Sequence, residues 1–334
     1  MSDNVHLQMA HMITGSWISQ MIYAAAKLEL ADRIGGGSRS VAELAVATGS
    51  HARSLYRLLR GLASLGVFSE DEPGVFSSTP LAATLRRDSV DSKWAQAVMM
   101  GEEHFAAWGD IVESVRTGET AFDRLYGKPI FDYLAEHPEK ARLFDAAMTS
   151  IHGHETRAML EAFDLSDIKT FADIGGGNGT NMIGVLNKYP DMNGILFDLP
   201  HVTARAEENL KRSGLSDRCR IVGGDFFGSI PGGADVYFMR HIIHDWDDDR
   251  SERILRNVAA AAAEGAKLLV VEHVLPKGNE PSFGKLLDIN MLLLPGGVER
   301  TADEFTRLYE SAGFRLTRVV PFSGDLSVVE GVKI

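Results

Sequence analysis

The residues best suited to acid–base chemistry lie in three separate segments of the chain. The first, residues 240–246, contains two histidines directly after a short apolar run typical of a buried strand. Glu272 ends the next apolar run, and Glu299 lies in a Gly-Gly-Val-Glu-Arg-Thr segment before a helical pattern. A histidine approached by carboxylates from two other loops is a general-base arrangement, because a carboxylate partner fixes the ring tautomer and stabilises the imidazolium. The three segments therefore predict proton transfer.

A glycine-rich loop, Asp173-Ile-Gly175-Gly-Gly177-Asn-Gly, lies between a predicted strand and a predicted helix. Glycines at such a position let the backbone turn tightly and approach a ligand closely. Asp198 ends the following strand, where folds of this kind bind the hydroxyl groups of a ribose. The pattern predicts a nucleotide-type cofactor, and glycines that serve only the turn are the simpler alternative.

Two cofactor classes would present a ribose to Asp198, a nicotinamide dinucleotide and S-adenosylmethionine. The loop lacks the later glycine of a dinucleotide fingerprint, and Asp173 would repel a pyrophosphate but attract the cationic amino and sulfonium side of adenosylmethionine. A third strand ends in Gly-Gly-Asp225-Phe226, a carboxylate and a ring that suit the amine and the face of adenine. These residues favour S-adenosylmethionine.

The segments with this chemistry follow a regular alternation of strand and helix patterns from residue 170 onward. Such βαβ units predict a mostly parallel sheet covered by helices on both faces. A turn at Ser323-Gly324-Asp325 predicts that the last two strands form an antiparallel hairpin at the sheet edge. The expected strands are 170–175, 194–199, 219–223, 235–239, 267–273, 313–321 and 326–333, and the expected helices between them 178–188, 202–213 and 249–264.

The first part of the chain is mostly helical instead. Ser40 and Glu43 form a helix-start signature, two helices end near Gly49 and Gly66, and a tight turn at residues 72–74 separates two short β-like runs. This outline is a winged helix. Near the N-terminus an apolar stripe predicts a helix that packs on its own core or on a second subunit; it comprises Val5, Met9, Met12, Ile13, Trp17, Met21 and Ile22.

Composition limits the partners of this 334-residue chain. With 34 basic and 46 acidic residues the net charge is −12, which disfavours nucleic acid and anionic membranes. No apolar run reaches the ~18 residues of a membrane helix, the N-terminus lacks the features of a signal peptide, and Cys219 alone can form no internal disulfide. We expect a soluble, cytoplasmic protein without membrane or nucleic-acid partners, and no metal site, because a suitable ligand set is missing.

Together these motifs resemble the S-adenosylmethionine-dependent O-methyltransferases that include caffeic acid, isoflavone, acetylserotonin and bacterial polyketide-tailoring enzymes. DIGGGNG, DLP at 198–200, GGDFF, HDW and GGVERT occur in the family's order along nearly the whole chain. The resemblance implies an α/β, Rossmann-like class I methyltransferase domain with a seven-stranded, mostly parallel sheet, and an N-terminal winged-helix dimerisation domain. We expect the dimerisation domain at 1–100 and the methyltransferase domain at 101–334, with a helical connector at about 101–165 and the core at 166–334.

The resemblance also implies roles for individual residues. The family's general base falls on His244, and its flanking acids fall on Glu272 and Glu299. Cofactor contacts fall on Asp173, Gly175, Gly177, Asp198, Asp225, Phe226, Arg240 and Trp246. Arg240 replaces the lysine of many plant members, and the segment before Gly296 is too short to carry their asparagine, which puts a substrate contact there in doubt. Pocket candidates by position, which core packing explains equally well, are Phe144, Met148, Asn290 and Met291.

The expected protein is a homodimeric O-methyltransferase that methylates a hydroxyl of an aromatic or polyketide-like small molecule and releases S-adenosylhomocysteine. Two alternatives stay open. A non-methylating relative would bind S-adenosylmethionine but catalyse hydroxylation or decarboxylation, and a DNA-binding regulator would sense the cofactor. The acid–base residues disfavour the first alternative, and the acidic charge disfavours the second.

Overall fold

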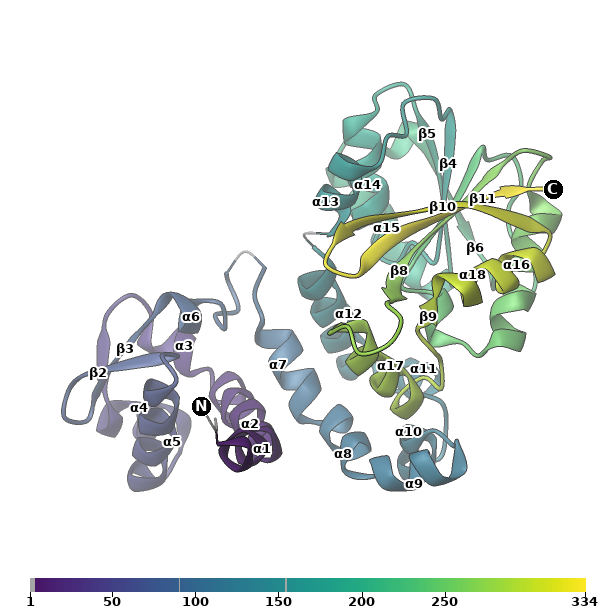
Figure 1. Cartoon of the computed structure of the whole chain (residues 1–334). Helices are drawn as coiled ribbons and strands as arrows, with labels where there is room; N and C mark the ends of the chain where they lie inside the picture. Colours follow the sequence, from purple (N-terminus) through teal and green to yellow (C-terminus); the bar gives the residue numbers. More distant parts are fainter. Residues whose placement is uncertain (1–3, 90, 154) are drawn as a thin grey trace. The chain divides into compact units, whose positions relative to one another are not determined.

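The computed structural model describes residues 4–89, 91–153 and 155–334, drawn as a ribbon in Figure 1. The chain divides into two compact units. The first unit contains the residues up to Gly109 together with Asp132–His152, and the second contains Asp110–Phe131 and Gly153–Ile334. The helical segment that precedes the βα part of the chain is therefore shared between the two units.

The first unit has the expected winged-helix outline. Ser40 caps the first helix of the pair in a capping box with Glu43, and Gly74, with a φ of +78°, lies in the turn of the hairpin. Leu44, Leu59 and Phe76 from these elements lie in one buried cluster. The elements are α1 (Val5–Ile13), α2 (Gly15–Lys27), α3 (Leu30–Ile34), β1 (Ser38–Ser40), α4 (Val41–Thr48), α5 (Ala52–Ser64), β2 (Phe68–Glu72), β3 (Val75–Ser78) and α6 (Pro80–Ala83).

The apolar stripe near the N-terminus is divided between two helices, because α1 ends at Ile13 and α2 begins at Gly15. Met21 on α2 packs against the buried cluster of the unit. Met12 and Trp17, in contrast, are 66% and 68% exposed, and α1 has no buried residue. Most of the stripe is therefore a surface of this unit and not part of its own core.

Further helices lead into the second unit. In the first unit α7 packs against α2 and α12, with Ala95, Met99 and Ala147 at the centre of the contact with α12. The helices are α7 (Trp94–Gly101), α8 (Glu103–Gly109), α9 (Ile111–Thr117), α10 (Ala121–Tyr126), α11 (Ile130–Glu136), α12 (Pro138–His152) and α13 (Glu155–Ala162).

The second unit is built around a mostly parallel sheet in the order β10-β11-β8-β7-β4-β5-β6. The pairs between β8, β7, β4, β5 and β6 are parallel, and β10-β11 and β11-β8 are antiparallel. The seven strands expected from the sequence are confirmed, with ends that differ by at most two residues. They are β4 (Thr170–Ile174), β5 (Asn193–Asp198), β6 (Cys219–Gly223), β7 (Val236–Arg240), β8 (Lys267–Leu275), β10 (Phe314–Ser323) and β11 (Leu326–Lys333).

One strand of the second unit was not expected, nor was β1 (Ser38–Ser40) of the first unit, which pairs with β3. The two residues of β9 (Arg300–Thr301) pair with the end of β8, where Val274 lies opposite Arg300. Because β8 runs two residues further than predicted, to Leu275, it provides the edge on which β9 forms. This pairing fixes the segment that contains Glu299.

Helices cover both faces of the sheet, as Figure 1 shows. Successive residues of β4 alternate between two buried clusters: Phe171 packs with α13, α14 and α15, and Ala172 lies in the cluster of α16 and α18. This alternation is the expected pattern of a strand buried on both faces. The helices are α14 (Thr180–Lys188), α15 (Pro200–Arg212), α16 (Asp248–Ala261), α17 (Gly284–Leu293) and α18 (Ala302–Ser311).

The parallel strands end at one edge of the sheet, and the residues that follow them supply the chemistry predicted above. Two short 3₁₀ helices complete the unit, η1 (Ser216–Arg218) before β6 and η2 (Ile243–Asp245) after β7. Within the described part of the chain, no helix is both long and apolar enough to cross a membrane.

Candidate active site

His244 lies on η2, 6% exposed, against a carboxylate from a distant segment. Its Nδ1 is 2.6 Å from Oε1 of Glu299, and its Nε2 is 3.6 Å from Oδ1 of Asp245. Glu299 is 2% exposed, so the contact between ring and carboxylate is shielded from water. The ring nitrogen opposite Glu299 is therefore the one available for proton exchange with a substrate.

Glu272 has a different task. This residue of β8 is fully buried, and its Oε1 accepts a hydrogen bond of 2.9 Å from the backbone N–H of His244. It therefore holds the turn that carries the histidine and does not contact the ring nitrogen. Of the two flanking acids, Glu299 is therefore the one whose carboxylate contacts Nδ1 of His244.

The charges of this cluster explain its proton affinity. Burial alone would lower the pKa of His244, but the charge and hydrogen bond of Glu299, together with Asp245 and Glu272, raise that pKa to about 10. Burial raises the pKa of Glu272 to about 7, against the opposing effect of His244. The site thus stabilises an imidazolium, the form that His244 takes after it accepts a proton.

The backbone segments that contain His244 and Glu299 pack closely against each other. The backbone N–H of Val298 donates to the carbonyl of His244 at 2.9 Å. A Cβ on Gly297 would lie 1.9 Å from that carbonyl oxygen, so only glycine fits at this position. The close approach of this segment to His244 therefore requires the second glycine, Gly297.

The neighbouring histidine, His241, favours the neutral form. Burial and the nearby His244, Arg240 and His273 keep the pKa of His241 well below its usual value. Its Nε2 lies 2.9 Å from Oε2 of Glu155, the first residue of α13, and the neutral ring donates there. The ring centroids of His241 and His244 are 5.1 Å apart, so one imidazole is kept neutral beside another that favours the cation.

The glycine-rich loop surrounds a second buried acid. Asp173 in β4 is 1% exposed, and its Oδ2 has no hydrogen-bond partner among the described residues. Burial raises its pKa to about 7, Arg240 opposes this rise, and Asp198 adds to it. A buried carboxylate without a bonded partner is costly, and a cationic ligand would remove that cost. This observation fits S-adenosylmethionine and argues against a pyrophosphate.

The loop itself turns through left-handed backbone conformations. Gly175 has a φ of +75°, and a Cβ there would lie 2.4 Å from Cδ1 of Ile242. Gly177 has a φ of +56°, and its N–H donates to Oδ2 of Asp198 at 2.8 Å. Asp198 also accepts from the N–H of its neighbour Leu199 at 2.7 Å, so its carboxylate is held at the end of β5.

Aromatic rings gather beside these carboxylates. The centroids of Phe226 and Trp246 are 6.0 Å apart in an edge-to-face contact, and Phe227 lies 4.8 Å from Trp246. Oδ1 of Asp225 accepts the N–H of Phe227 at 2.8 Å. This group brings together the residues expected to contact adenine.

Arg240 takes part in a chain of polar contacts with α13 and α14. Its Nη1 donates to Oγ1 of Thr156 at 2.8 Å and lies 3.7 Å from Oε2 of Glu155. Thr156 in turn donates to Oδ1 of Asn181 at 2.6 Å.

The four predicted pocket residues fall into different units. Asn290 and Met291 lie on α17 in the unit of His244, and Met291 is 7% exposed. The Met291 carbonyl accepts the N–H groups of Gly296 and Gly297 and so supports the turn before Glu299. Phe144 and Met148 lie on α12 in the first unit, where they pack against the apolar contact with α7.

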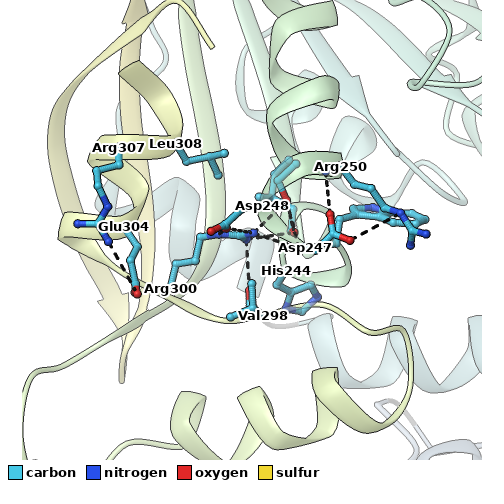
Figure 2. A network of polar contacts seen from close by, with 12 residues as sticks. His244, Asp247, Asp248, Arg250, Val298, Arg300, Glu304, Arg307 and Leu308 are labelled. Atoms are coloured by element: carbon cyan, nitrogen blue, oxygen red, sulfur yellow. Dashed lines mark hydrogen bonds and ion pairs between the residues drawn. The ribbon is translucent and has the colours of Figure 1, made fainter. Parts of the chain in front are cut away.

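Two residues of the site were not anticipated. Asp288 on α17 accepts the backbone N–H of Glu299 at 2.9 Å. Arg300 is 1% exposed and donates to the backbone of the His244 turn, as Figure 2 shows. The partner of Asp288 and most acceptors of Arg300 are backbone groups, which carry no sequence signal. The described residues include no group of three or more His, Cys, Asp or Glu side chains that could hold a metal.

Comparisons with known proteins agree with this geometry. A family model of an O-methyltransferase domain matches residues 108–315, and one of an O-methyltransferase dimerisation domain matches residues 10–88. The chain is 49% identical over 319 residues to the phenazine O-methyltransferase PhzM of Lysobacter antibioticus, which covers 96% of this chain and 94% of that protein.

Solved structures give the same result. The crystal structure of LaPhzM matches with a TM-score of 0.95 and 48% identity over 99% of each chain. The O-methyltransferase NcsB1, in complex with S-adenosylmethionine and 2-hydroxy-5-methyl naphthoic acid, matches with a TM-score of 0.85 and 32% identity over 95% of this chain and 96% of that one.

Proposed function

The chain belongs to the S-adenosylmethionine-dependent O-methyltransferases, and we propose that it methylates a hydroxyl of a flat, polycyclic aromatic molecule with His244 as the general base. One observation carries the role of His244: its Nδ1 lies 2.6 Å from the buried Glu299 carboxylate. This contact fixes the orientation of the ring and stabilises the imidazolium that forms when Nε2 accepts a proton.

S-adenosylmethionine supplies a methyl group on a sulfonium, which is already a good electrophile. The remaining task of the protein is to align the substrate oxygen and to remove its proton. A phenol has a pKa near 10 in water, so few of its hydroxyls are ionised at neutral pH. Nε2 of His244 takes this proton as the oxygen attacks, and Glu299 stabilises the imidazolium that results.

The glycine-rich loop and the strand ends provide the cofactor site in this proposal. Asp198 holds the ribose hydroxyls, and Gly175 and Gly177 line the methionyl part. Asp173 compensates the positive charge at the methionyl end of the cofactor. This role is supported by the buried Oδ2 of Asp173, which has no hydrogen-bond partner among the described residues. The adenine ring and the reacting end are covered by residues from the later strands, namely Asp225, Phe226, Arg240 and Trp246.

The proposed substrate class rests on the relatives. The 49% identical protein is named a phenazine O-methyltransferase, and the NcsB1 structure contains a naphthoic acid. We therefore infer that a hydroxylated bicyclic or tricyclic ring system is the substrate of this chain. Asn290 and Met291 on α17 are the proposed substrate contacts in the second unit.

A homodimer through the N-terminal domain completes the proposal. The matched dimerisation domain contains Met12 and Trp17, which are exposed and apolar. Burial of these side chains against a second copy stabilises the dimer by about 25 cal/mol for each Å² of apolar surface that is removed from water. A Trp17→Asp variant should shift the mass measured by light scattering from that of a dimer toward that of a monomer, whereas a wild-type monomer would refute this part of the proposal.

We also infer that the protein acts in the cytoplasm without nucleic-acid or membrane partners. The net charge of −12 repels phosphate backbones and anionic lipids. The single cysteine requires no oxidising compartment.

The function is tested by incubation of the purified protein with S-adenosylmethionine and a panel of hydroxylated phenazines, naphthoates and catechols. We expect a methylated product and an equal amount of S-adenosylhomocysteine for at least one polycyclic phenol. An O-methylated form of each hit serves as the control and should not react. Turnover of a substrate without S-adenosylhomocysteine would instead indicate a non-methylating enzyme.

A further inference from the structure

Arg300 is among the largest fully buried side chains, yet it takes no part in the chemistry proposed above. Its Nη2 donates to the Trp246 carbonyl at 3.0 Å and to Oγ of Ser251 at 3.1 Å. Its Nη1 lies 3.3 Å from the carbonyls of both Ile243 and Val298. In Figure 2 the side chain extends toward the loop that carries His244.

Asp248, in the first turn of α16, anchors the guanidinium. Oδ1 of this carboxylate lies 2.9 Å from Nε and 2.8 Å from Nη2 of Arg300. The planar group is thus held at one edge by a carboxylate while its other donors reach backbone carbonyls. Such a fork needs arginine, because lysine offers three donors on a single nitrogen.

These contacts join the two segments that form the acid–base pair. Ile243 and Trp246 flank the His244 turn, and Val298 and Arg300 flank Glu299 in the sequence. Ser251 also donates to the carbonyls of Ile243 and Trp246, at 3.2 Å each, so Arg300 and this hydroxyl share the same two acceptors. Loss of the guanidinium would leave buried carbonyls with fewer donors and the turn less restrained.

We propose that Arg300 is a positioning residue that holds the His244 turn in register with Glu299, an inference that rests on the proposed role of His244 as the base. Arg300 acts through the backbone and contacts neither ring nitrogen of His244. Its effect should appear as a change in the His244–Glu299 contact. A residue that only filled the core would change the stability of the protein and leave that contact as it is.

The test follows the His244 ring in the full-length protein by nuclear magnetic resonance with ¹⁵N-labelled histidine, across a pH titration without substrate. The charged and titratable groups that face this ring are Glu299, Asp245 on η2, Glu272 on β8 and His241. None of these residues is substituted in Arg300→Lys, which keeps the positive charge at position 300 but loses the forked set of donors. We expect the pKa of His244 to fall, because the ring moves away from Glu299, and kcat to fall by about 10²-fold, the cost of a small misplacement.

The sign of the shift separates positioning from charge. If Arg300 acted only through its charge, Arg300→Lys would leave the pKa of His244 unchanged, and Arg300→Met would raise it because a nearby cation is removed. Either result would overturn the proposal. Arg318→Lys is the matched control, since Arg318 forms a similar two-pronged pair with Glu330 at 3.1 and 2.8 Å; it should leave both the pKa of His244 and kcat unchanged.

A milder pair of variants keeps the test decisive if Arg300→Lys does not fold. Asp248→Ala removes the anchor of the guanidinium, and Asp249→Ala removes the next carboxylate of the same helical turn. We expect a smaller fall in the pKa of His244 for Asp248→Ala only, and equal behaviour of the two variants contradicts the proposal. Because the titration needs no substrate, it stays informative even if no methyl transfer is found.

Discussion

Two of the buried carboxylates of the site, Glu299 and Asp173, differ in how their charge is balanced. Glu299 and Asp173 are 2% and 1% exposed, and each has one oxygen without a hydrogen bond among the described residues. Oε1 of Glu299, however, lies 2.6 Å from a histidine whose pKa it raises to about 10. Asp173 makes no ion pair within the described ranges, and its own pKa rises to about 7.

This difference separates a region that is complete in the protein alone from one that a ligand completes. In the proposed reaction the His244–Glu299 pair already stabilises the product of proton transfer, so we expect little reorganisation when a hydroxyl gives up its proton. Asp173 keeps its unfavourable energy until a cation arrives, and that energy then contributes to the affinity for the ligand. Variants in the first region should therefore alter the chemical step, and those in the second should alter binding and stability.

The largest effect is expected for His244→Ala. Without the imidazole no group takes the proton, and kcat should fall by the ~10²–10⁴-fold that a general base contributes. The affinity for S-adenosylmethionine, measured by calorimetry, should stay within about twofold, because the cofactor site is the other region. His201→Ala, at an exposed histidine of α15, is the control and should retain full activity. Unchanged turnover of His244→Ala would mean that another group is the base.

Glu299→Gln should change the pH dependence more than the maximal rate. Neutral His244 is the active form, so kcat/KM rises with pH until the pKa of His244 is passed. Loss of the carboxylate charge lowers that pKa, and the rising limb should move to lower pH by about 1–3 units, the usual effect of an opposite charge at this distance. Glu272→Gln should move the limb less, because Glu272 binds the backbone N–H and not the ring. Equal shifts for the two variants would contradict the division of tasks between them.

The cofactor loop was predictable from the sequence because its parts are local. Asp173, Gly175 and Gly177 lie within five residues, and Asp198 follows at the end of the next strand, so the βαβ pattern alone brings them together. The parallel strands of the sheet were equally predictable, since they are short apolar runs bounded by turns. The positions of these residues in the structure agree with that prediction, and their contacts with a ligand stay a prediction.

The acid–base region was predictable only in part, because long-range register decides it. Glu272 and Glu299 lie 28 and 55 residues from His244, and which of them meets Nδ1 depends on the unexpected pairing of Arg300 with Val274. Arg300 itself gave no signal, because its acceptors are mostly backbone carbonyls. The apolar stripe of α1 and α2 left its partner open for a similar reason: periodicity identifies an apolar face but not the surface that covers it.

Asp173→Asn tests the ligand-completed region directly. The amide keeps the shape of the side chain but removes the charge that would balance a cation. We expect the Kd for S-adenosylmethionine to rise by roughly 10–100-fold, as is typical when a hydrogen bond to a charged group is lost. At saturating cofactor kcat should change little. A large loss of kcat with unchanged Kd would instead indicate that Asp173 acts in the chemical step.

In the ligand-free protein the same substitution should increase the stability, although it weakens the binding of the cofactor. The pKa of Asp173 is about 7 in the folded protein and about 4 when unfolded, so the folded state binds the proton more tightly. The stability of the wild type therefore falls as pH rises from about 4 to about 7, and the cost stays constant above that. Asp173→Asn lacks this titration, and its Tm should equal that of the wild type near pH 4 and exceed it by several degrees at pH 8, because each unit by which burial raises the pKa costs about 1.4 kcal/mol of stability above that pKa. Saturating S-adenosylmethionine should reverse the order at pH 8, because only the carboxylate gains from the cation. If the variant is no more stable than the wild type at pH 8 without ligand, Asp173 already has its charge balanced by the protein, and the contrast with Glu299 does not hold.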